Sequence, residues 1–203
     1  MEQFLNFLLD NEKSAVKGKK MTFNKGENLK LESTDGQTNY VFGISEGIIA
    51  VNQDMSILEF LGPNQFLGLT TDKRSKLYGE VLSKTATVWK FNLQDVLMAV
   101  SNSKNGLQLY NEYMVGAYDR LTKKISIMKL NKQNRLHLSL RMIGSSFAEK
   151  TADGSVVRLP ECFTKKALAS YTGIKASTLT NILKKLHEGG QIIYSRRVLL
   201  INL

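Results

Sequence analysis

The chain has 203 residues, of which 42% are hydrophobic and 23% are charged, and its formal net charge is +10. One cysteine and two histidines exclude an internal disulfide framework and a self-contained four-cysteine iron–sulfur site, and they disfavour a His/Cys zinc site. No apolar run approaches the roughly 18 residues of a membrane span, and the first ten residues lack the basic region of a signal peptide. We therefore expect no membrane association and a cytoplasmic location.

The positive charge is concentrated in the C-terminal third. The first 130 residues hold 16 basic and 14 acidic side chains, whereas the last 73 hold 12 and 4, a net charge of +8. A positive field at one end of a chain favours a nucleic-acid-binding module there. A solvated, lysine-rich face is the alternative explanation.

The N-terminal half is predicted to form a β-roll. Residues 2–11 have the apolar spacing of a short amphipathic helix, with Phe4, Leu5, Leu8 and Leu9 on one face. From Thr22 to Phe91, β-rich runs alternate with turn signals about every 8–12 residues. This pattern is typical of an antiparallel, jelly-roll-like β-roll. The segment with Lys17, Lys19, Lys20 and Met21 is predicted to be solvated.

Helices are predicted to follow Asn92, which suits an N-cap. The first helix has an apolar face of Leu93, Val96, Leu97 and Val100, and it is followed by a break at residues 101–105. A longer helix then carries apolar residues at near-heptad spacing, namely Leu107, Tyr110, Met114, Ala117, Leu121, Ile125 and Met128. These seven residues are candidate dimer contacts, because one small roll cannot cover so long a stripe. These residues could instead line a ligand pocket between two protomers, but a packed dimer interface is favoured.

The chain is expected to divide into three parts. Residues 1–100 are predicted to form an effector-type β-roll domain with flanking short helices, and residues 101–130 the long dimerisation helix. Residues 131–203 are predicted to form the DNA-binding domain. This last part begins with a helix over about 132–148, whose inward residues are Leu136, Leu140, Ile143 and Phe147.

Residues 164–201 have the pattern of a winged helix-turn-helix. Thr164 can cap a helix over 165–171, Gly173 can adopt the positive φ of a tight turn, and a second helix spans 176–188. The predicted buried positions are Leu168, Ala169, Ile174, Leu179 and Ile182, with Ala169 small where the two helices nearly touch. Strands over 191–194 and 198–201 flank a basic wing tip. A three-helix unit used for protein contact is the alternative.

The second helix presents short side chains on its outer face, which would let it enter a major groove about 12 Å wide. Asn181 can pair with adenine and Ala176 can contact a thymine methyl group, so we expect a preference for A·T pairs. The basic side chains are expected to contact phosphates. The candidate DNA-binding residues are Lys165, Lys166, Lys175, Ala176, Ser177, Thr178, Thr180, Asn181, Lys184, Arg196 and Arg197.

This order of elements resembles the Crp/Fnr family of bacterial transcription regulators over nearly the whole chain. Residues 23–29, 40–51 and 61–68 resemble successive motifs of the family's β-roll. The resemblance implies a homodimer paired along the long helix, in which an effector domain sets the posture of two helices that read an inverted-repeat operator on double-stranded DNA. It leaves RNA polymerase open as a further partner.

The chain departs from the cyclic-nucleotide-binding members of that family. Those members carry Gly-Glu and, after a short helix, Arg-Ser or Arg-Thr, where the Glu binds the ribose hydroxyl and the Arg binds the phosphate. Here Leu69 follows Gly68, and only five residues separate Gly68 from Arg74. Unpaired polar groups on the ligand would oppose binding, so we expect no cyclic-nucleotide dependence. The reading helix also lacks the arginines of the cyclic-AMP-responsive members, so the operator should differ from theirs.

No Ser/His/Asp constellation, P-loop or carboxylate pair is evident, so we expect no enzyme activity, no cofactor and no metal site. Cys162 is expected to be inert. The sequence therefore predicts an α+β, homodimeric, DNA-binding transcription regulator whose effector is not identified. The alternatives are a regulator that senses a cyclic nucleotide or another small molecule, and a nucleic-acid-processing protein tethered by its winged helix.

Overall fold

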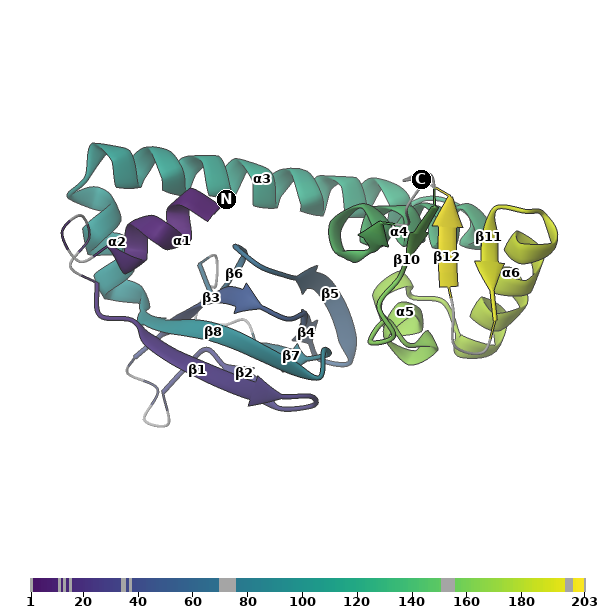
Figure 1. The fold of residues 1–203 in the computed structure, drawn as a ribbon, viewed down its shortest axis with the longest axis horizontal. Helices are drawn as coiled ribbons and strands as arrows, with labels where there is room; N and C mark the ends of the chain where they lie inside the picture. Colours follow the sequence, from purple (N-terminus) through teal and green to yellow (C-terminus); the bar gives the residue numbers. More distant parts are fainter. Residues whose placement is uncertain are drawn as a thin grey trace. The chain divides into compact units, whose positions relative to one another are not determined.

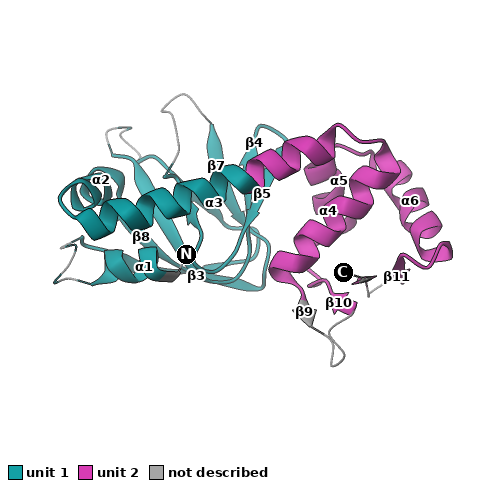
Figure 2. Cartoon of the chain, turned by 90° about the horizontal axis from the view of Figure 1, so that it is seen from above, with its two compact units in different colours: residues 1–119 teal, residues 120–203 magenta. Residues whose placement is uncertain are grey.

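The computed structural model describes residues 2–10, 12, 14, 16–33, 36, 38–69, 76–150, 156–195 and 199–202. The fold is α+β, with antiparallel sheets in the N-terminal half and mainly helices in the C-terminal half (Figure 1), as predicted. The chain forms two compact units, residues 1–119 and 120–203 (Figure 2). None of the described helices is long and apolar enough to cross a membrane.

Two four-stranded antiparallel sheets form the roll of the first unit. One sheet has the order β1-β8-β3-β6, and its strands are Lys19–Asn24, Thr85–Asn92, Tyr40–Glu46 and Phe66–Leu67. The other has the order β2-β7-β4-β5, and its strands are Asn28–Lys30, Leu77–Val81, Ile49–Gln53 and Ser56–Leu61. The sheets enclose one apolar cluster, which includes Leu29, Phe42, Ile44, Ile49, Val81 and Val88.

The lysines of the predicted solvated segment are exposed, as expected, but Lys19, Lys20 and Met21 belong to the edge strand β1. Lys19 and Lys20 are exposed, while Met21 and Phe23 are half-buried and pack against the interior of the roll. Lysines are common on edge strands because they discourage pairing with another sheet.

A second apolar cluster joins the β1-β8-β3-β6 sheet to the first three helices. Phe4 and Leu8 of α1 (Glu2–Leu9), Val96 of α2 (Leu93–Ser101) and Phe91 of β8 are all buried in it. The Asn92 side chain caps α2 by accepting a hydrogen bond from the Gln94 N–H at 2.8 Å, as predicted. The predicted inward position of Leu97 is wrong, because that side chain is 38% exposed and Ala99 is buried instead.

The long helix α3 (Lys104–Met128) is anchored to the roll at two points. A Cβ atom at Gly106 would lie 2.5 Å from the ring of Phe7, so glycine permits the close approach of α1. The Tyr113 hydroxyl accepts a hydrogen bond from the Phe66 N–H at 2.9 Å and donates one to the Phe66 carbonyl at 3.1 Å. One face of α3 is therefore committed to the core of the first unit.

The second unit contains α4 (Lys132–Phe147), α5 (Lys165–Thr172), α6 (Ala176–Glu188) and a small antiparallel sheet. The sheet has the order β11-β12-β10-β9, and its strands are Ile192–Tyr194, Leu199–Asn202, Val156–Arg158 and Glu149–Lys150. The predicted inward residues Leu136, Leu140 and Ile143 are buried. Phe147 is half-buried against Phe163, with 5.5 Å between the ring centroids.

Candidate nucleic-acid interface

Local hydrogen bonds define a helix-turn-helix in α5 and α6. The Thr164 hydroxyl accepts a hydrogen bond from the Ala167 N–H at 3.2 Å and so caps α5. Gly173 ends that helix in the left-handed region, with φ 65° and ψ 24°, and its N–H bonds to the Ala169 carbonyl. Glycine adopts this conformation without steric cost. The predicted cap, the turn and the 176–188 helix are confirmed.

The inner faces of α5 and α6 form the core of the motif. The buried residues include Leu168, Ile174, Leu179, Ile182, Leu183 and Leu186, as predicted. The predicted burial of Ala169 is wrong, because Ala169 is half-buried and Ala167 is buried. The buried face of α5 consists of residues 167, 168, 171 and 172. Ala169 is rotated about 100° from Leu168 around the helix axis and so lies at the edge of that face.

The outer face of α6 is formed by short side chains. Ala176, Ser177, Asn181 and Lys184 are exposed, and Thr178 and Thr180 are half-buried. The Thr180 hydroxyl donates a hydrogen bond to the Ala176 carbonyl at 3.0 Å, so the helix itself occupies this donor. The Asn181 amide makes no hydrogen bond to any residue that the structure describes, and it is therefore available to a ligand.

Exposed lysines lie on α5, on α6 and at the residue before α6. Lys165, Lys166, Lys175 and Lys184 are all exposed, and the Lys165 ammonium group lies 5.4 Å from the ring centroid of Tyr194 on β11. Residues 156–195 contain six basic and two acidic side chains, which gives a net charge of +4. One of the two acidic residues, Glu161, lies 3.9 Å from Arg158. The motif therefore presents a positive surface to a polyanion.

Strands β11 and β12 pair antiparallel, with Ile192 opposite Ile201 and Tyr194 opposite Leu199. They are the two strands predicted for the wing. β11 begins one residue later than the predicted 191–194, and β12 is shifted by one residue from the predicted 198–201. Arg196 and Arg197, the predicted basic wing tip, lie outside the described residues.

Arg135 supports the turn of the motif and was not identified from the sequence. Its guanidinium donates hydrogen bonds to the Thr172 carbonyl at 3.3 Å and to the Leu130 carbonyl at 3.1 Å. It thereby connects α4 to the C-terminal end of α5. The sequence carries no local signal for this contact, because the partners are 37 and 5 residues away.

The candidate dimer residues of α3 differ in how far the rest of the chain covers them. Tyr110, Met114 and Ala117 pack against the core of the first unit, and Met128 is half-buried. Leu107, Leu121 and Ile125 are 56%, 45% and 59% exposed. Val115 and Tyr118, which the heptad pattern did not include, are 61% and 72% exposed. The exposed α3 stripe therefore consists of Leu107, Val115, Tyr118, Leu121 and Ile125.

The roll has an apolar side chain where the resemblance would place a ribose-binding glutamate. Gly68 adopts φ 99°, and a Cβ atom there would lie 2.6 Å from the Tyr40 carbonyl oxygen. The next residue, Leu69, is 7% exposed and belongs to the cluster beneath α1 to α3. Arg74 lies outside the described residues.

Comparison with known proteins finds similarity to solved structures. No family model and no curated protein sequence matches it. A cyclic nucleotide-binding domain containing protein from Listeria monocytogenes is similar, with a TM-score of 0.82, 18% identity, and coverage of 99% of this chain and 96% of that one.

Two similar structures are described as regulators. A CRP/FNR-family transcriptional regulator from Thermus thermophilus has a TM-score of 0.69 and 15% identity, over 90% of this chain and 93% of that one. The c-di-GMP responsive global regulator CLP of Xanthomonas campestris has a TM-score of 0.72 and 12% identity over the full length of both chains. These similarities confirm the predicted fold.

Proposed function

We propose that this protein is a sequence-specific, DNA-binding transcription regulator that binds an inverted-repeat operator as a homodimer. The observation that carries the proposal is the outer face of α6, where short exposed side chains are surrounded by lysines. An α-helix is about 10–12 Å wide with its side chains, and the major groove is about 12 Å wide. Short side chains allow the helix to approach the base edges closely.

Base reading is assigned to the exposed positions of α6. Asn181 can form two hydrogen bonds with adenine, and Ala176 can contact a thymine methyl group. Ser177, Thr178 and Thr180 complete the face as smaller polar contacts. Because no arginine projects from this face, the contacts should favour A·T pairs over guanine.

Phosphate contacts are assigned to the basic side chains around the reading face. These are Lys165, Lys166, Lys175 and Lys184, together with Arg196 and Arg197 of the wing. Phosphate contacts fix the register of a protein on DNA without reading sequence, and their formation releases counterions. Affinity for any DNA should therefore fall steeply as salt is raised.

Pairing of two chains is assigned to α3. The stripe comprising Leu107, Val115, Tyr118, Leu121 and Ile125 exposes apolar side chains along one side of the helix. A two-fold dimer would place two copies of α6 in successive major grooves, with half-site centres about 34 Å apart. The proposed division is an effector-type roll in residues 1–100, a dimerisation helix in 101–130 and a DNA-binding domain in 131–203.

The proposed regulator does not depend on a cyclic nucleotide. Leu69, buried and apolar, cannot accept a hydrogen bond from a ribose hydroxyl at the position after Gly68. A regulator that senses another small molecule is the second candidate, and a cavity in the roll favours it.

The test begins with genomic footprinting, which gives the operator. Binding of the operator and of a scrambled duplex is then measured by fluorescence anisotropy across a salt series. Asn181→Ala should weaken operator binding by about 1–3 kcal/mol and leave scrambled DNA nearly unchanged. Lys184→Ala should weaken both duplexes and reduce the salt slope by about one.

Lys84→Ala is the matched control, because it removes an exposed lysine from the roll rather than from the second unit. It should leave both affinities nearly unchanged. The assignment of the reading face is wrong if Asn181→Ala weakens both duplexes equally or leaves operator binding intact. The whole proposal fails if no operator is recovered and the affinities for all duplexes are equal.

A further inference from the structure

A lysine faces the interior of the roll. Side chains alternate between the two faces of a strand, so Lys90 of β8 continues the inward row of Ala86 and Val88. Val88 is fully buried and Lys90 is half-buried. A lysine is seldom placed toward an apolar interior unless its charge has a partner. The question is therefore which groups face the Lys90 charge.

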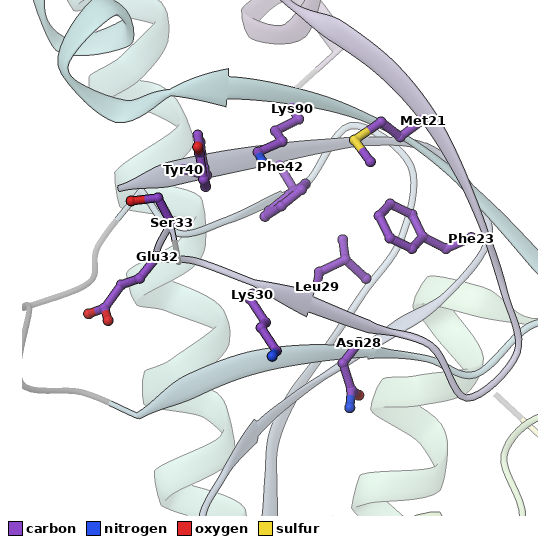
Figure 3. A pocket seen from close by; sticks show the side chains of 10 residues that line it. All are labelled: Met21, Phe23, Asn28, Leu29, Lys30, Glu32, Ser33, Tyr40, Phe42 and Lys90. Carbon is purple, nitrogen blue, oxygen red and sulfur yellow. The ribbon is translucent and has the colours of Figure 1, made fainter. Parts of the chain in front are cut away.

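A cavity opens at this end of the roll, between the edge strands β1 and β2 (Figure 3). Its volume is about 510 Å³, within the range of roughly 300–1,000 Å³ that small-molecule sites occupy. Its apolar lining comes from both sheets and comprises Met21, Phe23, Leu29 and Phe42. Leu29 and Phe42 are buried, while Met21 and Phe23 are half-buried.

The Lys90 ammonium group lies against an aromatic ring in this cavity, 3.4 Å from the ring centroid of Tyr40. It forms no ion pair with a carboxylate of any described residue. The one acidic residue of the described lining is Glu32, and Figure 3 shows its carboxylate directed away from Lys90. The Lys30 ammonium group also points away from the cavity in this view.

A second cation lies beside Lys90. Lys19 of β1 is directly opposite Lys90 in the antiparallel register, so both side chains project to the same face of the sheet. Like charges directly opposite each other are destabilising. An anion between them would remove that repulsion.

We propose that this cavity binds a small organic carboxylate with an apolar body. Lys90, assisted by Lys19, would bind the carboxylate, and Phe23, Leu29 and Phe42 would bury the apolar part. Gly68 and Leu69 are not among the described lining residues, although Gly68 lies next to Tyr40 of the lining. The proposal concerns the first unit alone, so it stands or falls independently of DNA binding.

The test uses three probes that share one apolar body and differ in the head group: 3-phenylpropionate, 3-phenylpropanol and 3-phenylpropylammonium. Each is titrated calorimetrically into the full chain without DNA. The carboxylate should bind about tenfold more tightly than the alcohol, because hydrogen bonds to a charged group are roughly twice as strong as neutral ones. The ammonium probe should show no binding.

Substitutions then locate the site. Lys90→Met keeps a long apolar side chain and should abolish the preference for carboxylate over alcohol, whereas Lys90→Arg should retain it. Lys20→Met is the matched control, because Lys20 lies on the same strand as Lys19 but projects to the opposite face. It should leave both affinities unchanged. Circular dichroism establishes that each variant is folded.

Three results would overturn the proposal. One is equal binding of the carboxylate and the alcohol, or no binding of the carboxylate at about 10 mM, which corresponds to under 3 kcal/mol of binding free energy. Another is a carboxylate preference that survives in folded Lys90→Met. The third is an equal loss of that preference in Lys20→Met.

Discussion

Replacement of Leu121 tests whether α3 pairs two chains. Leu121 lies in the middle of the exposed α3 stripe and is 45% exposed in the single chain. In a two-fold interface the same patch is used by both protomers, so one substitution removes two side chains from the contact. The effect of the substitution on the free energy of dimerisation is therefore doubled.

The magnitude follows from the exposed fraction. Complete burial of a leucine side chain stabilises by about 1.5–3 kcal/mol, and roughly half of that burial is still available at Leu121. Leu121→Ala should therefore cost about 1 kcal/mol per protomer and about 2 kcal/mol per dimer, or roughly a 30-fold weaker dimer. Leu121→Glu also places a charge in the contact and should yield monomers that bind the operator much more weakly.

Sedimentation equilibrium measures the dissociation constant of each variant, and a gel shift measures operator binding. Leu97→Ala is the control, because Leu97 is also an exposed leucine, at 38%, but belongs to α2 and not to the stripe. It should leave association unchanged. A dimeric, fully active Leu121→Glu protein would refute the assignment, as would equal effects of the two alanine substitutions.

Three further predictions concern stability and ligand binding. Gly173→Ala should destabilise the fold by about 1–2 kcal/mol in urea melts, because φ is 65° there, and Gly173→Asn should cost less. Burial lowers the pKa of His137 from its ordinary 6.5, and the nearby Arg141 charge lowers it further. The unfolded chain then binds more protons than the folded chain, so stability should fall as the pH drops below about 6.5. In urea melts at several pH values, the free energy of unfolding of His137→Gln should depend less on pH. Calorimetry should detect no cyclic AMP binding at millimolar concentration, and gel shifts should not require it.

The parts of the fold that sequence predicts well are those fixed by near neighbours in the chain. Asn92 and Thr164 bond to N–H groups two and three residues ahead, and Gly173 is selected by its own φ. The apolar period of α6 is equally local, because the residues at i, i+3, i+4 and i+7 share a face whatever covers them. These features depend little on the rest of the molecule, so their patterns were sufficient.

The errors in predicted burial occur where tertiary contacts decide which face of a helix is covered. Val96 and Val100 are buried with Ala99 rather than with Leu97, because the roll covers a slightly different arc of α2 than the apolar pattern indicates. Along α3, the roll covers Tyr110 and Met114, and the exposed apolar side is shifted to Val115 and Tyr118. Periodicity identifies a helix and its apolar content, but the position of a neighbouring unit decides which residues stay accessible.

The cavity beside Lys90 lies where a charged residue interrupts an apolar row of a strand. The alternation in residues 85–91 places Ala86, Val88 and Lys90 on one face, although Lys90 was not singled out from the sequence. Natural sequences agree with their fold at most positions, and departures are concentrated at functional sites. On α6, the departure is an outer face of short side chains among lysines, and in the roll it is a charge in an apolar row. The first suits a polyanion that must approach closely, and the second suits a small anion with an apolar body.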